Sequence, residues 1–306
     1  MSVLLHPRLQ ALEAGFAVSE LQPILDQAFV GQQLELWIKR DDLLHPIISG
    51  NKWRKLKYVL NHALSIGADT LVSMGGCHSN HLHALAYVGK CLQMQTIAYV
   101  RGEPPENFNP TLLDLQAWGM ELRFVSRSDY RQLRDYRSHD ALPGLLPGQY
   151  WLPEGGASVL ALQGVADIVH EIHRDFDCLL VACGTGTTLA GLVVAAPVGT
   201  QVLGIAALKG GDFLHADVQQ LLKNRAIHAH WRIAQDYHFG GFAKSTPALQ
   251  RFMQQFETRH HIPLEPVYTG KLLFAVYDLL YKGHFKSGQR IIVLHTGGLQ
   301  GVRTCN

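Results

Sequence analysis

Short apolar runs alternate along most of the chain with longer stretches of helical spacing. Most of the short runs are continuous and uncharged, as strands buried on both faces of a parallel sheet are. The predicted strands are residues 34–39, 70–74, 95–100, 121–125, 178–181, 201–207 and 290–295. The predicted helices, in which apolar residues recur every three to four positions, are residues 82–92, 109–118, 159–174, 189–196 and 272–281. This alternation predicts the α/β class.

The length of the chain, 306 residues, suits either two domains of roughly 150 residues each or one large domain. A stretch rich in proline and glycine, residues 142–156, is the predicted place where the chain passes between two lobes. Neither an internal repeat nor a low-complexity tract interrupts the pattern. The sequence therefore favours two lobes joined near the middle of the chain.

Composition narrows the class of partner. Apolar residues make up 47% of the chain and charged residues 17%, and the formal net charge is +2. That charge gives no basic field of the kind that a nucleic-acid-binding protein needs, so we expect no nucleic acid and a small-molecule partner. The longest uncharged apolar stretch, residues 189–198, is far shorter than the ~20 residues that cross a bilayer, so we expect no membrane attachment.

The cysteines give an expectation about the cellular compartment. There are five, an odd number, and none forms a C-x-x-C pair. They are Cys77, Cys91, Cys178, Cys183 and Cys305. Scattered single cysteines favour reduced thiols and hence a cytoplasmic protein. Each is equally compatible with a small buried hydrophobic side chain.

Lys52 is the strongest single candidate for chemistry. The segment 49–60 opens with loop-forming residues and then takes helical spacing. Projection of this helix puts Lys52 on an apolar stripe with Leu56, Val59, Leu60 and Ala63, and the opposite stripe is Arg54, Lys57, Asn61 and His62. A lysine among apolar neighbours at a helix N-terminus has a lowered pKa, and its free amine can form a Schiff base with a carbonyl. The alternative is a lysine that extends from the edge of a core helix to solvent.

A loop rich in glycine and threonine lies between a predicted strand and a predicted helix. It consists of Gly184, Thr185, Gly186, Thr187 and Thr188. Its backbone N–H groups, its hydroxyls and the positive end of the following helix suit a phosphate. The loop lacks the G-K-[ST] of a Walker motif, and Leu189 stands where the third glycine of a dinucleotide motif belongs. A cup for one phosphate ester is therefore favoured, with a plain strand-to-helix turn as the alternative.

A second loop, residues 75–81, leads from the strand at 70–74 into another helix. Ser79, Asn80 and His81 place a hydroxyl, an amide and an imidazole at that helix N-terminus, which suits a substrate carboxylate. His78, His81 and His83 also invite a metal interpretation. Their spacing supplies no third ligand of matched type and no H-E-x-x-H, so we expect no metal and interpret them as polar loop groups.

An inward lysine, a phosphate cup and a carboxylate cradle together describe pyridoxal 5'-phosphate acting on a small amino acid. Six sets of short motifs follow one another in a specific order. They are IKRDD at 38–42 with SGNK at 49–52, SNH at 79–81, PEGG at 153–156, GTGTT at 184–188, PVYTGK at 266–271 and HTGG at 295–298. In these motifs, over nearly its whole length, the chain resembles the tryptophan synthase β-like (fold type II) pyridoxal-phosphate enzymes. Within them it resembles the family of 1-aminocyclopropane-1-carboxylate (ACC) deaminase and D-cysteine desulfhydrase.

The resemblance implies catalytic roles for three residues. Lys52 would hold the cofactor as a Schiff base and, once displaced by substrate, act as an acid and base at the substrate carbons. Ser79 would contact the substrate carboxylate, with Asn80 and His81 beside it, and could also serve as a nucleophile or proton relay. Tyr268 would face the substrate.

The resemblance also implies the residues that bind the cofactor. Asn80 would hydrogen-bond the phenolic oxygen of the pyridoxal ring. Either Thr269 or Thr296 would neighbour the pyridine nitrogen. The phosphate would be held by Thr185, Gly186, Thr187 and Thr188.

The fold implied by the resemblance is the fold type II architecture, with two open parallel-sheet α/β domains and the cofactor in the cleft between them. Residues 1–52 and 168–306 would form the large cofactor-binding domain. Residues 53–167 would form the small α/β domain. Enzymes of this fold commonly form homodimers, so we expect a homodimer.

Four departures from the family pattern bear on the substrate. The deaminases carry glutamate at the position of Thr269, where a carboxylate keeps the pyridine nitrogen protonated and the ring a strong electron sink. Phe239, in the segment 238–241, stands where a second active-site tyrosine is expected. His78 replaces a glutamine, and the segment between residues 125 and 150 is short. A threonine at 269 is typical of the desulfhydrases.

These observations favour one function and leave three alternatives. The favoured function is a pyridoxal-phosphate-dependent lyase or deaminase that performs α,β-elimination on a small amino acid. It would act like D-cysteine desulfhydrase, to give pyruvate, sulfide and ammonia. The alternatives are an ACC deaminase, a β-replacement synthase of the same fold, and a phosphate-ligand binding protein without catalysis. Lys52 argues against the last, because a binding protein needs no amine at that position.

Overall fold

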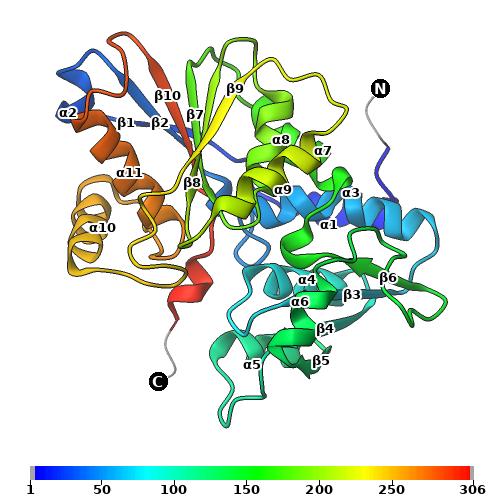
Figure 1. The fold of residues 1–306 in the computed structure, drawn as a ribbon. Coiled ribbons are helices and arrows are strands. Elements are labelled where there is room, and N and C mark those ends of the chain that lie inside the picture. The colour runs from blue at the N-terminus through cyan, green and yellow to red at the C-terminus, as the bar shows by residue number, and fades with distance from the viewer. Residues whose placement is uncertain (1–3, 304–306) are drawn as a thin grey trace.

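The computed structural model describes residues 4–303. Two β-sheets form the centres of two α/β domains (Figure 1). In order across the sheet, the six strands of the large sheet are β1 (Leu21–Ile24), β2 (Glu35–Lys39), β10 (Arg290–Leu294), β7 (Cys178–Cys183), β8 (Gln201–Ala206) and β9 (His230–Ala234). Those of the small sheet are β5 (Met120–Val125), β4 (Gln95–Arg101), β3 (Thr70–Gly75) and β6 (Gln149–Leu152). This arrangement confirms the predicted fold class.

The helices lie outside the two sheets (Figure 1). They are α1 (Pro7–Glu13), α2 (Gln27–Val30), α3 (Asn51–Ser65), α4 (Asn80–Cys91), α5 (Pro110–Ala117), α6 (Arg127–Leu133), α7 (Val159–His170), α8 (Thr187–Ala195), α9 (Asp212–Leu222), α10 (Pro247–His260) and α11 (Thr269–Tyr281). Three short 3₁₀ turns are η1 (Asp41–Leu43), η2 (Glu154–Gly156) and η3 (Leu299–Val302). None of the helices in the described chain has the length and apolar character needed to cross a bilayer.

Strand pairing in both sheets is parallel except at one edge. β1 runs antiparallel to β2, and Pro23 lies within it, which an edge strand tolerates because one side needs no N–H donor. β10 lies between β2 and β7, so Val293 pairs with Ile38 on one side and with Leu180 on the other. The large sheet therefore unites strands from both ends of the chain.

The large sheet is buried on both faces because its strands are apolar at successive positions. In β7, Cys178, Leu180 and Ala182 face one core, and Leu179, Val181 and Cys183 face the other. α10 and α11 cover the first face, and α7, α8 and α9 cover the second (Figure 1). Such continuous apolar runs are the signature of a parallel sheet between two helical layers.

The small sheet has one extensive core and one modest one. Leu71 and Ala98 face a core that α3, α4 and α5 complete. Val72 and Met74 face the other side, where Trp151 and Tyr130 complete a smaller cluster. The helices of the larger core position the N-termini of α3 and α4, which carry the candidate lysine and the candidate carboxylate cradle.

All seven predicted strands are present, and three further strands were not predicted. All three, β1, β6 and β9, are short strands at the edges of their sheets. The interpretation of residues 142–156 as an inter-lobe passage is wrong in part, because β6 lies within that segment and pairs with β3. All four strands of the small sheet lie within residues 53–167, and the domain boundaries at residues 52/53 and 167/168 stay predictions.

Candidate active site

The carboxyl ends of strands from both sheets converge on one cavity of about 920 Å³. The loop after β3, the loop after β7 and residues 296–298 after β10 all line it, as do the first turns of α3, α4 and α8. Ligands of open α/β sheets bind at this end of the strands. The cavity contains Lys52, Ser79, Asn80, His81, Thr185, Gly186, Thr188, Tyr268 and Thr296, which are most of the predicted site residues.

Lys52 is the second residue of α3, and its position depends on a close backbone approach. Gly50, with φ of +63°, precedes the helix, and a Cβ there would lie 1.8 Å from the carbonyl oxygen of Thr296. Only glycine allows this contact. The end of β10 is thereby held against the N-terminus of α3. The remaining predicted stripe of α3, Leu56, Val59, Leu60 and Ala63, is buried as expected.

The prediction for the opposite stripe is wrong at Arg54, which is buried. Its guanidinium donates to both carboxylate oxygens of Asp41 at 3.0 and 3.1 Å and also pairs with Glu171. Lys39 donates to the same Glu171 carboxylate at 2.8 Å. α7 packs against this side of α3, which a helical projection of α3 alone could not reveal. The resulting ion network holds α3 in place behind the cavity.

The electrostatic setting of Lys52 makes its amine easier to deprotonate than that of an ordinary lysine. Burial lowers the pKa of Lys52 to about 8, although the carboxylate of Glu265 acts in the opposite direction. Its Nζ donates a 2.7 Å hydrogen bond to Oδ1 of Asn51, and Nδ2 of Asn51 donates to Oγ1 of Thr188 at 2.8 Å. Lys52 is therefore linked to the glycine and threonine loop through one side chain.

The glycine and threonine loop forms the N-terminus of α8. Gly186 adopts a left-handed conformation with φ of +71°, and a Cβ there would lie 2.6 Å from Val218. Gly184, Thr185, Gly186 and Thr188 line the cavity, whereas Thr187 is fully buried and does not. The Thr187 hydroxyl instead lies 3.2 Å from that of Thr185. The loop thus presents N–H groups and two hydroxyls to the cavity, which suits an anion.

A second lysine lines the cavity, and the sequence analysis missed it. Lys55 is buried one turn after Lys52 and donates from Nζ to the carbonyl oxygen of Gly155 at 2.5 Å. Burial, and the nearby charge of Lys52, bring the pKa of Lys55 well below its ordinary value. Gly155 lies against the phosphate cup, because a Cβ there would be 2.8 Å from the Thr185 side chain. Since Lys55 donates to Gly155, it lies on the side of the cavity that carries the cup. The sequence feature that could have identified Lys55 is its position three residues after Lys52 in the same helix.

The carboxylate cradle lies at the start of α4. Ser79 is the N-cap, and its Oγ accepts from the N–H of Leu82 at 3.2 Å. Asn80 accepts from Nε2 of Gln300 at 2.8 Å. His81 is buried, with Nε2 2.9 Å from the Ser73 hydroxyl, and its Nδ1 has no partner in the described chain. Burial lowers the pKa of His81 well below its ordinary value, so its imidazole is neutral.

The three histidines of the metal interpretation lie in separate environments. His78 is exposed, His81 bonds to Ser73, and His83 lies 2.8 Å from the Asp114 carboxylate. Among residues 4–303 no group of three or more histidine, cysteine, aspartate or glutamate side chains is arranged to hold a metal ion.

Tyr268 and Thr269 differ in their access to the cavity. The Tyr268 ring packs on Gly184 and lines the cavity, and burial raises the pKa of its phenol. Thr269 is completely buried and is not among the lining residues. Its Oγ1 accepts from the N–H of Glu265 at 2.9 Å. Of the two threonines predicted to neighbour the pyridine nitrogen, only Thr296 lines the cavity.

Glu265 is a further lining residue that the sequence analysis missed. It is almost fully buried, and burial raises its pKa. Its carboxylate accepts backbone N–H groups from three successive residues, Val267, Tyr268 and Thr269, at 2.6 to 2.7 Å. It therefore fixes the turn that carries Tyr268. The sequence feature that could have identified Glu265 is an acidic residue directly before Pro266, where the PVYTGK motif begins.

Two phenylalanines line the cavity, Phe213 and Phe242, and neither is the predicted Phe239. Phe239 packs edge-on against Phe274, with ring centroids 4.9 Å apart, in the core of the large domain. Phe242, three residues later, lines the cavity and lies 5.9 Å from the Tyr268 ring between centroids. The cavity therefore has a phenyl ring, which carries no hydroxyl, beside Tyr268.

The sequence profile of the family described as pyridoxal-phosphate dependent enzyme matches residues 21–297. The chain belongs to this family, and its cofactor is pyridoxal phosphate. A protein of Pyrococcus horikoshii whose name assigns it provisionally as an ACC deaminase is 34% identical over 97% of this chain and 96% of its own. The D-cysteine desulfhydrase of Salmonella schwarzengrund is 28% identical over 95% of this chain and 94% of its own. A solved structure of an ACC deaminase homologue covers 97% of this chain and 96% of its own, with a TM-score of 0.75 and 30% identity. The predicted family, fold type and cofactor are thereby confirmed.

The residues present fit this cofactor. A lysine with a lowered pKa, an anion-binding loop at the N-terminus of α8 and an unpartnered buried imidazole nitrogen on His81 all face or adjoin one cavity. Lys52 can bind an aldehyde covalently, and the loop at 184–188, with Lys55 beside it, can hold a phosphate. The cavity volume of about 920 Å³ accommodates the ring and an amino acid together.

Proposed function

We propose that this enzyme is a lyase that performs α,β-elimination on a small amino acid, with D-cysteine preferred to ACC. The overall reaction with D-cysteine consumes one water and gives pyruvate, ammonia and hydrogen sulfide. Bound pyridoxal phosphate supplies an electron-withdrawing ring that stabilises negative charge at the substrate α-carbon. The observation that carries the proposal is the position of Lys52, an amine with a pKa of about 8 between the phosphate cup and the carboxylate cradle.

Lys52 is the proposed proton carrier at the α-carbon. An amine whose pKa lies near neutral pH can accept a proton and return it without a large energetic penalty. Asn51 holds the amine by a 2.7 Å hydrogen bond, so Lys52 stays at the cavity wall when it is not covalently engaged. The charge of Glu265 keeps the pKa from falling further.

Ser79, Asn80 and His81 are proposed to hold the substrate carboxylate. The N-terminus of α4 adds backbone N–H groups and a positive helix end to these side chains. The neutral His81 keeps Nε2 on Ser73, which fixes the ring at the cavity wall. Asn80, which lies against Gly298, is proposed to orient the cofactor ring from the same side.

The preference for D-cysteine follows from the groups that the cavity lacks. The cavity carboxylates are Glu154 and Glu265, and Glu265 is occupied by three backbone N–H groups. Thr269 offers no carboxylate to keep a pyridine nitrogen protonated, and Phe242 offers no phenol beside Tyr268. A weaker electron sink suffices when a thiolate leaves at once, because the developing charge departs with sulfur. Opening a cyclopropane ring has no such leaving group.

The test compares the two substrates under one set of conditions. We expect pyruvate, sulfide and ammonia from D-cysteine, and little or no 2-oxobutanoate from ACC. Tyr268→Phe, measured beside wild type, shows whether the phenol contributes to either reaction. A higher kcat/KM for ACC would contradict the ranking. Activity toward neither would point to another small amino acid or to β-replacement, which an added nucleophile would reveal by entering the product.

ACC deamination is the second candidate function. It is favoured by the 34% identity to the Pyrococcus horikoshii relative, which exceeds the 28% identity to the Salmonella desulfhydrase. Thr269 and Phe242, which supply neither a carboxylate nor a phenol, argue against it. The same paired assay decides between the two.

A homodimer in the cytoplasm is the proposed state of the enzyme. Several large apolar side chains of the described chain are more than half exposed, among them Leu4, Val18, Leu25 and Val30. Burial of such side chains between two copies would remove them from water. Light scattering on the purified protein tests the dimer, and fractionation of cells tests the compartment.

A further inference from the structure

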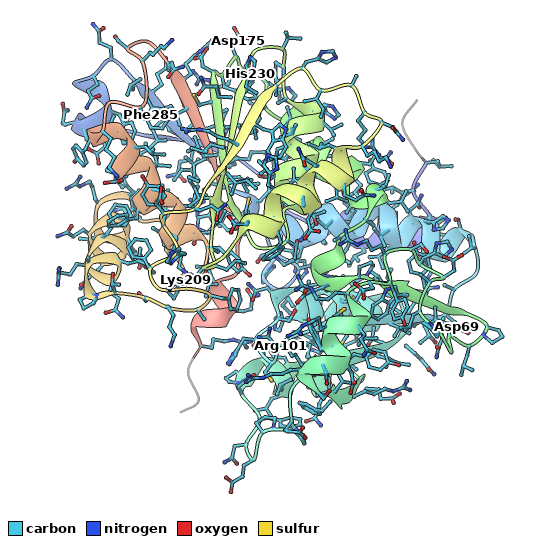
Figure 2. The ribbon with its side chains drawn as sticks, in the orientation of Figure 1. Asp69, Arg101, Asp175, Lys209, His230 and Phe285 are labelled. Atoms are coloured by element: carbon cyan, nitrogen blue, oxygen red, sulfur yellow. The ribbon has the colours of Figure 1, made fainter. Side chains whose placement is uncertain are left out.

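Four arginines line one side of the active-site cavity, and the reaction proposed above needs none of them. Arg101 ends β4, Arg127 and Arg131 lie on α6, and Arg134 follows α6. All four belong to the small-sheet domain. Figure 2 shows Arg101 on the side of that domain that faces the large one.

The strand register fixes the position of these arginines relative to Ser79. Gly75 of β3 pairs with Val100 of β4, so Arg101 lies beside the residue that begins the loop to Ser79. Arg101 in turn pairs with Val125 of β5, directly before α6. Neighbouring strands are about 4.8 Å apart. Along this edge of the sheet, Arg101 therefore lies one strand away from the carboxylate cradle, and the start of α6 lies two strands away.

Packing orients Arg101 and Arg134. The Arg101 guanidinium lies 5.8 Å from the centre of the Tyr130 ring, and the Tyr130 hydroxyl donates to Glu154 at 2.6 Å. Arg134 pairs with the other Glu154 oxygen at 2.8 Å and lies over the ring of Phe213 in α9, at 5.6 Å. α6 is thus held across the cavity, and the Glu154 charge is matched by Arg134.

The other three arginines keep unmatched charges. Within residues 4–303, no carboxylate forms an ion pair with Arg101, Arg127 or Arg131. The two anions that the proposed reaction requires have sites elsewhere, the cofactor phosphate at residues 184–188 and the substrate carboxylate at residues 79–81. The planar guanidinium is the side chain best suited to bind a further carboxylate or phosphate.

We infer that the preferred substrates are amino acids with a second anionic group at the far end of the side chain, and that Arg101 and Arg127 bind that group. The inference rests on the proposed elimination and names its substrate class. A separation of one to two strand spacings, about 5 to 10 Å, between the α-carboxylate and the distal anion matches a side chain such as that of S-carboxymethylcysteine. Elimination from this compound breaks the Cβ–S bond, and the electron pair leaves with sulfur as mercaptoacetate. One water then converts the remaining three-carbon fragment into pyruvate and ammonia.

The experiment compares two isosteric substrates on the holoenzyme. S-carboxymethylcysteine and its neutral amide, S-carbamoylmethylcysteine, are assayed for pyruvate in both D and L forms. We expect kcat/KM to favour the charged compound by about tenfold or more, the value of one charge-assisted hydrogen bond. Arg101→Met and Arg127→Met should each lower this ratio about tenfold. Arg251→Met, an exposed arginine of α10 away from the cavity, is the matched control and should leave the ratio unchanged.

O-phosphoserine in the same assay tells a distal phosphate from a distal carboxylate, and preference for either supports the inference. Equal kcat/KM for the charged and neutral isosteres would overturn it. A preference that vanishes at high salt would also overturn it, since that behaviour belongs to long-range steering by exposed charge and not to a contact.

A binding measurement separates this inference from the proposed reaction. Succinate and butanoate have no amino group and cannot react, so their affinities for the holoenzyme can be compared by calorimetry. We expect succinate to bind more tightly, with the difference lost in Arg101→Met. If that holds while no cysteine derivative yields pyruvate, the proposed reaction is wrong and the anion site stands. If D-cysteine is consumed but succinate and butanoate bind alike, the reaction stands and the anion site is wrong.

Discussion

Asn51 and Thr188 are 137 positions apart in the sequence, and a 2.8 Å hydrogen bond joins the Asn51 amide to the Thr188 hydroxyl. The same Asn51 accepts a hydrogen bond from the amine of Lys52. One side chain therefore connects the proposed covalent attachment point to the proposed phosphate cup. A change on either side of this connection is expected to alter the other.

Lys52→Ala is expected to abolish turnover. The variant lacks the amine that attacks the cofactor aldehyde and moves the proton at the α-carbon. In the wild type, borohydride should fix the pyridoxyl group on the peptide that contains Lys52, and mass spectrometry can locate it. Retained turnover in Lys52→Ala would rule out this mechanism. Cofactor binding without the covalent bond is compatible with it, because the phosphate cup remains.

Thr188→Val is expected to weaken pyridoxal phosphate binding by roughly ten- to a hundredfold, the value of a lost charge-assisted hydrogen bond of about 1.5 to 3 kcal/mol. Thr188→Ser keeps the hydroxyl and serves as the control. Pyridoxal without phosphate should bind wild type and variant alike, as measured by absorbance titration. Equal weakening of both ligands would mean that Thr188 acts through Asn51 or the fold.

The attachment of the cofactor is expected to depend on pH through Lys52. Because burial lowers the pKa of Lys52 to about 8 from the ordinary 10.5, the reactive free amine becomes the major form above about pH 8. The rate at which apoenzyme gains the Schiff-base absorbance should rise with pH and level off there. Glu265→Gln removes a carboxylate that raises this pKa, so the midpoint should move to lower pH. Glu257→Gln on α10 is the control, and a shift of equal size in both variants would contradict the assignment to Glu265.

Glu171→Gln is expected to reduce stability at neutral pH by about 1 kcal/mol or less, since its side chain is 41% exposed. Burial tends to raise the pKa of Glu171, but the hydrogen bond from Arg54 and the charges of Arg54 and Lys39 outweigh it and lower the pKa. Its stabilising contribution is therefore present above its ordinary pKa of 4.5 and is lost as the pH falls through the lower folded value. Urea unfolding at several pH values should show wild type and variant converging in acid. Glu103→Gln, an exposed substitution, controls for general charge effects.

Gly164→Ala is expected to destabilise the protein by about 1 to 3 kcal/mol, the usual cost of overpacking. A Cβ at this position in α7 would lie 1.9 Å from the carbonyl oxygen of Arg54 in α3, and backbone atoms cannot move aside as a flexible side chain can. Gly15→Ala, where the nearest atom would be 3.6 Å away, is the matched control. Equal thermal midpoints for the two variants would mean that α3 and α7 can separate without loss.

Sequence patterns predicted the buried strands well because a strand covered on both faces must be apolar at every position. β7 and β10 are the clearest cases. The strands that were missed follow no such rule. β9 carries His230 and Arg232 because it is a half-exposed edge strand, and β6 is a four-residue strand within a loop-rich segment. Pairing with a neighbouring strand, which a local pattern cannot report, determines both.

Site residues could be predicted from the sequence where a local motif determines the backbone geometry. They could not be predicted where tertiary packing determines which side chains reach the cavity. The loop at 184–188, apart from Thr187, and the start of α4 line the cavity, and both have the residue types that helix N-termini require. Their binding of phosphate and carboxylate stays a prediction. Arg54 was misplaced because α7 covers the face of α3 that projection leaves open. Phe242 and Glu265 enter the cavity through turns whose direction depends on the whole large domain. Thr269 faces Glu265, which only the folded turn reveals.

The central position of β10 determines the order in which the two sheets can be completed during synthesis. The small sheet has all its strands once Leu152 has left the ribosome. The large sheet cannot close until Leu294 emerges, because β10 lies between β2 and β7 and pairs with both. Until then both strands expose an unpaired parallel edge, the kind of surface on which chains aggregate. The nascent chain therefore depends on residues 290–294, and on protection until they arrive, far more than a domain built from consecutive strands does.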